Sequence, residues 1–148
     1  MRLGSPPATV SASASPTPAP RRSCLSVPGS SAAMLAKAAS RGADEIVIDL
    51  EDAVAIPAKD EARATVVAAL SEPQWRGVRT SVRVNAPRTP WCHQDIVALA
   101  SLPDAPETIV VPKVESPADM AFIERLLDGA EAASGRPADA RTGTPVLR

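Results

Sequence analysis

Short aliphatic runs alternate with longer segments of helical periodicity along most of this 148-residue chain. The runs are rich in Val, Ile and Leu, which is typical of buried strands. The segments between them repeat apolar residues three or four positions apart, which is typical of amphipathic helices. The pattern predicts strands at 24–29, 45–50, 80–86 and 107–114, and helices at 30–42, 58–70, 94–102 and 116–134.

Signals at the helix ends agree with this pattern. Ser30 or Ser31 is suited to cap the first helix, and Gly42 to end it. Ser116 followed by Pro117 is a typical start for the last helix. The buried stripes of the second and fourth helices are expected to contain Ala62, Val66, Ala69 and Leu70, and Met120, Ile123, Leu126 and Leu127.

Four strand–helix units with aliphatic strands indicate a parallel sheet covered by helices. The segment "TPVLR" at 144–148 resembles the opening of a fifth strand. A (β/α)₈ barrel takes about 250 residues, so four units supply half of one. A five-stranded doubly wound sheet is the alternative, but its last strand needs a covering helix that this segment does not provide. We therefore predict an α/β fold, the first half of a (β/α)₈ TIM barrel with about four βα units plus the start of strand 5, over residues 22–148.

Residues 1–21 are rich in Pro, Ala and Ser and have no hydrophobic periodicity. Such a segment buries too little apolar surface to offset its ordering entropy, so we predict a disordered leader. Its Ser and Arg content is weakly typical of an organelle transit peptide. The prolines oppose the amphipathic helix that such a peptide forms, and disorder is the favoured interpretation.

Overall charge narrows the function classes, because 16 Lys and Arg residues nearly balance 17 Asp and Glu residues. This balance argues against a nucleic-acid partner or a membrane surface, and no stretch reaches the roughly 20 apolar residues of a membrane span. Cys24 and Cys92 have neither disulfide-framework nor zinc-site spacing, so we expect a cytoplasmic protein. Cys92 precedes His93, but catalytic Cys and His usually meet across a fold, which disfavours a nucleophile here.

Charged and amide side chains stand at the ends of the predicted strands. The carboxyl ends of parallel strands in a barrel converge on one mouth, where active sites lie. We expect the carboxylates there to pair with the cations across that mouth. The alternative is an ion-pair network that only holds the fold, which is disfavoured because desolvation tends to cancel the Coulomb gain. The residues concerned are Asp49, Glu51 and Asp52 after the second strand, Arg83 and Asn85 after the third, and Lys113 after the fourth.

Strand alternation assigns these side chains to faces of the sheet. Arg83 shares a face with Asn85, and Lys113 shares a face with Ile109 and Val111. The Arg83 guanidinium is a planar fork suited to a substrate carboxylate, and Asn85 adds an amide contact. Carboxylates without a His or Cys cluster suit Mg²⁺. The pattern indicates acid–base or metal-assisted chemistry on a small, carboxylated, oxygen-rich substrate.

The segment "VPGSS" at 27–31 places a glycine and two hydroxyls before a predicted helix. Such a segment is suited to binding an anion, but it is equally explained as a turn with a helix cap. It is not a P-loop, because no Gly-Lys-Ser or Gly-Lys-Thr follows.

Four motifs in the same order resemble a known family: "RSCLSVPGSSAAMLAKAASRGADEIVIDLEDAV", "KDEAR", "RVNAPRTPW" and "VVPKVES". They are similar to the amino-terminal half of the HpcH/HpaI aldolase and citrate lyase β-subunit superfamily, over residues 22–148. In the pyruvate-aldolase branch a histidine follows the Glu of the second strand. Asp52 occupies that place here, which favours the CoA-ester lyase branch.

The resemblance implies a (β/α)₈ barrel that cleaves a C–C bond in a 3-hydroxyacyl-CoA, such as citryl-, malyl- or citramalyl-CoA, with Mg²⁺. It implies that Arg83 holds a substrate carboxylate or carbonyl oxygen, and that Glu51 and Asp52 line the water shell of the metal. It places Pro28, Gly29, Ser30 and Lys113 on the CoA side. It also implies a homo-oligomer for the full-length form.

The resemblance also sets a limit, because the family's direct Mg²⁺ ligands are expected beyond residue 148. No residue of this chain is therefore predicted as a metal ligand, and the isolated chain is expected to be inactive. The alternative is a non-catalytic half-barrel fragment that associates with itself or with a full-length relative through its unpaired edge strands.

Overall fold

Strands and helices alternate through residues 20–135 and 146–147, the parts of the chain that the computed structural model describes. The four α-helices are α1 (Ala32–Ala38), α2 (Lys59–Leu70), α3 (Cys92–Ala100) and α4 (Pro117–Ala133). Two 3₁₀ turns, η1 (Ile56–Ala58) and η2 (Pro73–Trp75), flank α2. The strands are β1 (Cys24–Pro28), β2 (Glu45–Asp49), β3 (Thr80–Arg83), β4 (Thr108–Val111) and β5 (Val146–Leu147).

The described strands form one parallel sheet in the order β1-β2-β3-β4-β5. Each strand lies beside the next one in sequence, so this sheet lacks the order reversal at which doubly wound proteins bind ligands. The doubly wound alternative is therefore not supported. Consecutive strand order is the order found in a (β/α)₈ barrel. The register places Asp49 beside Arg83 and Arg83 beside Val110 across the sheet.

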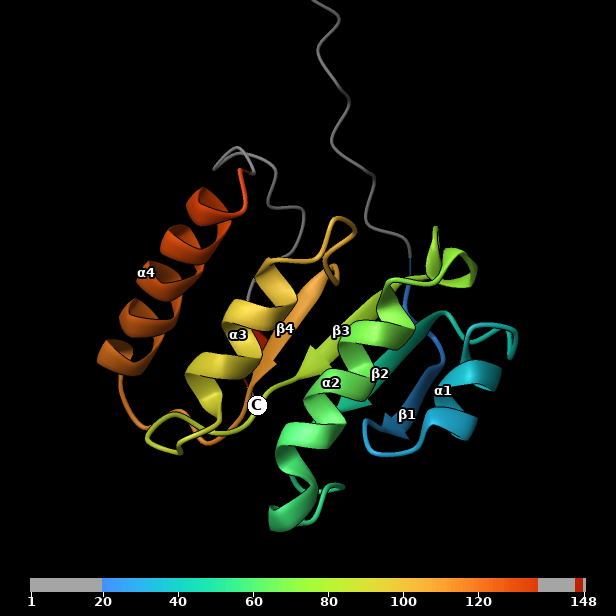
Figure 1. Cartoon of the computed structure of the whole chain (residues 1–148), viewed down its shortest axis with the longest axis horizontal. Helices are drawn as coiled ribbons and strands as arrows, with labels where there is room; N and C mark the ends of the chain where they lie inside the picture. The colour runs from blue at the N-terminus through green and yellow to red at the C-terminus, as the bar shows by residue number, and fades with distance from the viewer. Residues whose placement is uncertain (1–19, 136–145, 148) are drawn as a thin grey trace, which may run out of the picture.

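The four helices lie on one side of the sheet, with α1 and α4 at its opposite ends (Figure 1). The aliphatic side chains of that face, such as Ile48, Val82 and Ile109, belong to the buried core. From the helices, Val66 and Ile123 are fully buried against them. The stripes predicted for α2 and α4 are confirmed, because each of their residues is either in this core or packed against it.

Two strands end earlier than the apolar pattern indicates. The third strand ends at Arg83, and the backbone N–H of Asn85 donates to the carboxylate of Asp95 instead of to a neighbouring strand. The fourth strand ends at Val111, because Pro112 has no N–H and Lys113 adopts a left-handed conformation with φ of 53°. At both strand ends the chain therefore leaves the sheet, at the same points where the charged side chains lie.

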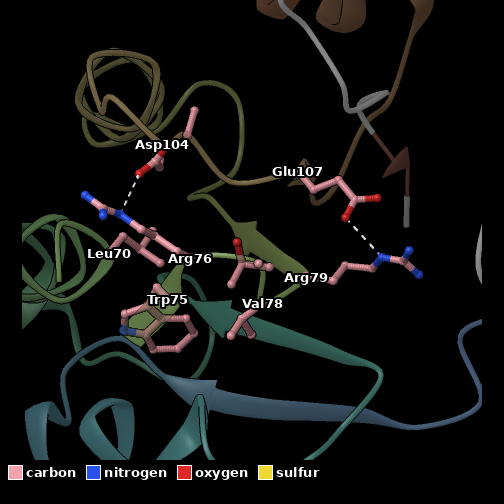
Figure 2. Close-up of a pocket in the computed structure, with 10 residues that line it drawn as sticks. Leu70, Trp75, Arg76, Val78, Arg79, Asp104 and Glu107 are labelled. Carbon is pink, nitrogen blue, oxygen red and sulfur yellow. Dashed lines mark hydrogen bonds and ion pairs between the residues drawn. The ribbon is translucent and has the colours of Figure 1, made fainter. Parts of the chain in front are cut away.

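Most of the predicted leader lies outside the described residues. Arg21, which the sequence assigns to the leader, forms ion pairs of 3.3 Å with Glu45 and 3.2 Å with Glu107. Glu107 also pairs with Arg79 at 3.0 Å, and both line a pocket beside the start of β3 (Figure 2). Within the described parts of the chain, none of the helices has the length and apolar character needed to cross a membrane.

Candidate active site

Asp49 occupies the carboxyl end of β2 and is 2% exposed. Its carboxylate accepts hydrogen bonds from the backbone N–H groups of Glu51, at 2.8 Å, and Ala53, at 3.1 Å. Arg83, the register partner on β3, donates from Nε at 2.9 Å and from Nη2 at 2.6 Å. Burial by itself raises the pKa of Asp49, but the Arg83 and backbone hydrogen bonds outweigh burial and hold this pKa below its usual value.

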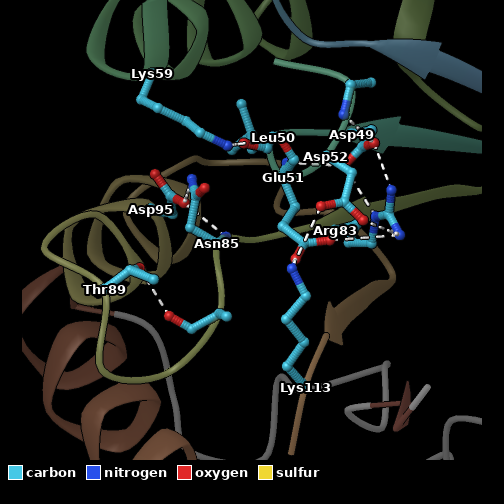
Figure 3. A network of polar contacts seen from close by, with 12 residues as sticks. Asp49, Leu50, Glu51, Asp52, Lys59, Arg83, Asn85, Thr89, Asp95 and Lys113 are labelled. Carbon is cyan, nitrogen blue, oxygen red and sulfur yellow. Dashed lines mark hydrogen bonds and ion pairs between the residues drawn. The ribbon is translucent and has the colours of Figure 1, made fainter. Parts of the chain in front are cut away.

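The Arg83 guanidinium is the centre of the cluster at the carboxyl ends of the strands (Figure 3). Its bidentate contact with Asp49, followed by the charges of Glu51 and Asp52, raises the pKa of Arg83, so it is a permanent cation. The third nitrogen, Nη1, makes only loose ion pairs, 3.5 Å from Glu51 Oε2 and 3.9 Å from Asp52 Oδ2. One side of the fork therefore retains the capacity to bind another oxygen.

Glu51 is the more deeply buried of the two carboxylates that follow β2, Glu51 and Asp52, and it is only 4% exposed. Lys113 Nζ lies 2.6 Å from Glu51 Oε1 and 3.3 Å from Asp52 Oδ1. Apart from these ion-pairing cations, no donor among the described residues bonds either Glu51 oxygen. Each carboxylate oxygen accepts more than one hydrogen bond, so Glu51 keeps acceptor capacity that a water or a substrate hydroxyl is suited to fill.

Lys113 reaches this cluster by a route that strand alternation does not predict. Alternation assigns it to the face of Ile109 and Val111, but both of these side chains pack in the core under the helices. The strand ends at Val111, and the φ of 53° at Lys113 redirects its side chain to Glu51 and Asp52. The predicted face is wrong, while the predicted pairing with the carboxylates is confirmed. A left-handed lysine is strained, and such strain is concentrated at functional sites.

The cluster therefore combines three carboxylates with two cations, all at the end of the sheet where the strands terminate. Comparison with known proteins gives this geometry its context. The sequence profile of the HpcH/HpaI aldolase/citrate lyase family matches residues 22–147, which is most of the chain. The chain belongs to this family.

Individual family members show the same relationship. The citrate lyase subunit beta of Leuconostoc mesenteroides is 40% identical over 117 residues, covering 79% of this chain and 38% of that protein. An L-malyl-CoA/beta-methylmalyl-CoA lyase of Cereibacter sphaeroides is 38% identical over 122 residues, covering 82% of this chain and 38% of that protein. The chain thus spans about two-fifths of the length of these relatives.

Among solved structures, CitE of Mycobacterium tuberculosis, in complex with magnesium, acetoacetate and coenzyme A, is similar to this chain. The two are 35% identical with a TM-score of 0.57, and the match covers 70% of this chain and 37% of the other. The two sequence relatives are named as lyases, and this chain shares their family.

The described residues of this family member do not fit a magnesium site by themselves. No three His, Cys, Asp or Glu side chains in residues 20–135 gather in a way that holds a metal ion. Arg83 and Lys113 already lie against the three carboxylates, so a dication placed directly among them would face two positive charges. That this chain supplies no direct metal ligand stays a prediction.

Asn85 does not join Arg83 in the cluster. Its side-chain amide donates to Asp95 at 2.7 Å, and Asn85 itself is 2% exposed. Arg63 from α2 donates to the other oxygen of Asp95, at 3.2 Å. Asn85 thus ties the end of β3 to α2 and α3, on the side of Figure 3 away from Arg83. A substrate contact for Asn85 stays a prediction.

The segment of Pro28, Gly29 and Ser30 borders the cluster, because Pro28 is the register partner of Asp49. Gly29 donates its backbone N–H to the Asp49 carbonyl at 2.8 Å. A Cβ on Gly29 would lie 2.8 Å from both Leu50 Cδ2 and Val66 Cγ2, so close packing explains the glycine. Ser31 caps α1. Contact of this segment with CoA stays a prediction.

Cys92 is a core residue and not a nucleophile at this site. It is buried at the start of α3, and this burial, with the nearby charge of Asp95, raises its pKa to about 11. A thiol with such a pKa is almost entirely protonated at neutral pH. The disfavoured Cys92–His93 pair therefore has no support from the structure.

Lys59 is a residue near the site that the sequence interpretation passed over. It is a buried cation at the start of α2, beneath the loop that carries Glu51. The signal was present in the sequence, since Lys59 lies three and seven positions before the buried Ala62 and Val66, on the apolar stripe of the helix.

Proposed function

We propose that residues 22–148 form the first half of the (β/α)₈ barrel of a CoA-ester lyase. Its reaction would be the cleavage of a C–C bond in a 3-hydroxyacyl-CoA such as citryl-, malyl- or citramalyl-CoA. The observation that carries the proposal is the Arg83 cluster at the carboxyl ends of the strands, in a chain whose relatives are citrate lyase and malyl-CoA lyase subunits. Carboxyl ends of barrel strands are where this fold places its chemistry.

Arg83 is the proposed substrate-binding cation. Asp49 engages Nε and Nη2 and so fixes the plane of the guanidinium, while Nη1 is the nitrogen directed to the substrate. Cleavage breaks the C2–C3 bond: the 3-hydroxyl loses its proton and becomes a carbonyl, the bonding electron pair leaves as an enolate on the thioester, and a proton returned to that enolate gives the acyl-CoA product. Arg83 would lie beside an oxygen of the substrate half that carries the carboxylate. Because its guanidinium is already fixed in place, it can stabilise charge on that oxygen during cleavage without having to reorient.

Glu51 and Asp52 are proposed to hold water or substrate hydroxyls on the opposite side of that oxygen. Glu51 retains acceptor capacity inside the cluster, and Asp52 is exposed at its rim. Lys113, whose side chain is 64% exposed, is the cation at the outer edge of the site. With Pro28, Gly29 and Ser30, it is proposed to face the anionic CoA.

Magnesium is proposed as the cofactor of the complete enzyme, on the basis of the CitE complex of M. tuberculosis. Its direct ligands are expected outside residues 1–148. The described residues do not form a ligand set for it.

A chimera tests the proposed function. This chain is fused to the part of the C. sphaeroides malyl-CoA lyase that follows the matched region, and cleavage of the three thioesters is followed by release of their carbonyl products. The chain alone is expected to be silent, and the chimera to cleave at least one thioester. Arg83→Lys is expected to lower kcat/KM by about a hundred-fold or more, because an ammonium lacks the bidentate fork.

Arg88→Lys is the matched control. Arg88 is an exposed arginine on the next loop, paired with Glu115 at 2.8 Å, and its substitution is expected to leave kcat/KM unchanged. Turnover by the chain alone would contradict its predicted silence. A folded chimera that cleaves none of the thioesters would contradict the lyase proposal, and normal rates for Arg83→Lys would remove Arg83 from the mechanism.

A further inference from the structure

Lys59 is held in a buried position directly beneath the loop that follows β2 and carries Glu51 and Asp52, called the β2 loop below. It is only 6% exposed, and its Nζ donates to the carbonyl oxygens of Leu50, at 2.9 Å, and Glu51, at 2.6 Å (Figure 3). The ring of Trp91 lies on another side, with its centroid 5.9 Å from Nζ. A buried ammonium requires such partners, because desolvation without them is costly.

The two carbonyls belong to consecutive peptide groups, and this makes the contact a clamp. The peptide between Leu50 and Glu51 is bound at both ends, since its C=O accepts from Lys59 and its N–H donates to Asp49 at 2.8 Å. The next peptide has its C=O bound to Lys59 as well, and the same oxygen accepts from the Val54 N–H at 3.1 Å. Peptide groups are planar, so holding the two that flank Glu51 fixes the φ and ψ of Glu51.

Those two angles set the direction of the Glu51 Cα–Cβ bond, from which the side chain extends. Lys113, 2.6 Å from Oε1, and Arg83, 3.5 Å from Oε2, then hold the carboxylate at the end of that side chain. Lys59 contributes through the backbone, because its polar partners are the Leu50 and Glu51 carbonyl oxygens rather than the carboxylates.

We propose that Lys59 is a positioning residue, which fixes the backbone of Glu51 and so aims its carboxylate into the active site. The clamp itself is a property of this chain, while its value for catalysis rests on the proposed lyase function. Lys59 acts through Glu51 and does not reach the substrate.

Amide hydrogen exchange of the isolated chain, followed by NMR, tests the clamp without any turnover. Lys59→Met keeps the aliphatic stem and removes the ammonium. We expect the amides of Glu51 and Ala53, both bound to Asp49, to exchange roughly ten-fold faster in this variant, because their local opening loses the opposing restraint. The Val84 amide, bonded to the Val110 carbonyl within the sheet, is the internal reference and is expected to be unchanged.

Arg63→Met is the matched control, because Arg63 is also on α2 and partly buried but pairs with Asp60 and Asp95 instead of the β2 loop. It is expected to leave the ratio of Glu51 to Val84 exchange as in the unmodified chain. If Lys59→Met had the same ratio of Glu51 to Val84 exchange as the unmodified chain, the clamp would be overturned. If Lys59→Met does not fold, the same measurement is made on Lys59→Gln. We expect its ratio of Glu51 to Val84 exchange to lie between that of the unmodified chain and a roughly ten-fold increase, and an unchanged ratio would again overturn the proposal.

The catalytic consequence is measured separately in the chimera. Lys59→Met is expected to lower kcat more than it raises KM, because Glu51 would be misdirected while Arg83 still binds the substrate. A changed exchange ratio with normal kcat would leave the clamp standing and overturn its role in positioning. A chimera that is inactive before any substitution would refute the lyase function and not the clamp.

Discussion

At the residue scale, the Asp49–Arg83 pair has both a structural and a functional part. Asp49 is buried and satisfied by two backbone N–H groups and by the guanidinium, whereas Arg83 is only partly buried and retains one loosely paired nitrogen. The carboxylate thus holds the loop and the cation in place together. Removing its charge would loosen both, so Asp49 is expected to matter for stability before it matters for binding.

We predict that Asp49→Asn lowers the free energy of unfolding by about 2–3 kcal/mol near neutral pH, because breaking a buried charged pair leaves its partner uncompensated. The measurement is urea unfolding of the isolated chain. Asp52→Asn is the control, since Asp52 is exposed and its substitution is expected to change stability by less than about 0.5 kcal/mol. Equal effects of the two substitutions would contradict the structural role of Asp49.

The difference in unfolding free energy between the unmodified chain and Asp49→Asn is also expected to depend on pH. The folded-state pKa of Asp49 lies below its ordinary value, so its contribution is fully present above the ordinary pKa and is lost as the pH falls through the folded-state pKa. The gap in unfolding free energy between the unmodified chain and Asp49→Asn should therefore narrow as the pH falls below the ordinary Asp pKa of about 4. A constant gap over that range would mean that the Asp49 charge is not what stabilises the loop.

At the scale of elements, the join between β1 and α1 depends on close packing. Gly29 lies where β1 turns toward α1, against Leu50 and against Val66 of α2. By contrast, Gly129 is within α4, and a Cβ there would meet nothing within 4 Å. The two glycines therefore have opposite expected responses to the same substitution.

We predict that Gly29→Ala destabilises the chain by about 1–3 kcal/mol, since the added methyl forces the β2 loop or α2 to shift. Gly129→Ala is the matched control and is expected to stabilise by about 0.5–1 kcal/mol, because alanine is the better helix former. Thermal and urea unfolding measure both changes. A neutral Gly29→Ala would show that the segment is free to move, which would favour an anion-binding role over a packing role.

At the scale of the whole molecule, the two ends of the sheet carry different exposed surfaces. At one end, a groove of about 540 Å³ beside β1 is lined by Leu25 and Met34, with Lys37 at its rim. At the other end, α4 carries Phe122, which is 50% exposed, and Glu124. Within the described strands, the outer edge of β1 has no partner, and exposed parallel edges favour pairing with another chain.

We predict that the isolated chain associates head to tail, with the α4 end of one copy against the β1 end of another. Sedimentation equilibrium is expected to give at least twice the 15.3 kDa of one chain. Met34→Glu is expected to shift the protein to monomer, and Val97→Glu, on the exposed face of α3 between the two ends, is the control. A monomer throughout, or equal effects of both substitutions, would exclude the self-associating half-barrel.

The order of elements and the burial of their faces were determined by the sequence alone. Hydrophobic periodicity is a local property, so the stripes of Val66 and Ile123, and the position of Asp49 at the end of its strand, follow from neighbouring residues. The convergence of Asp49 and Arg83 also followed, because parallel strands end on the same side of a sheet.

Only the tertiary structure decided how the remaining side chains meet. The left-handed backbone at Lys113 turns it out of its strand face and toward Glu51. Asn85 is drawn to Asp95 on α3, and Lys59 to the carbonyls beneath Glu51. Each of these contacts joins side chains to backbone or to segments whose relative positions are set by packing, so no local pattern in the sequence contains them.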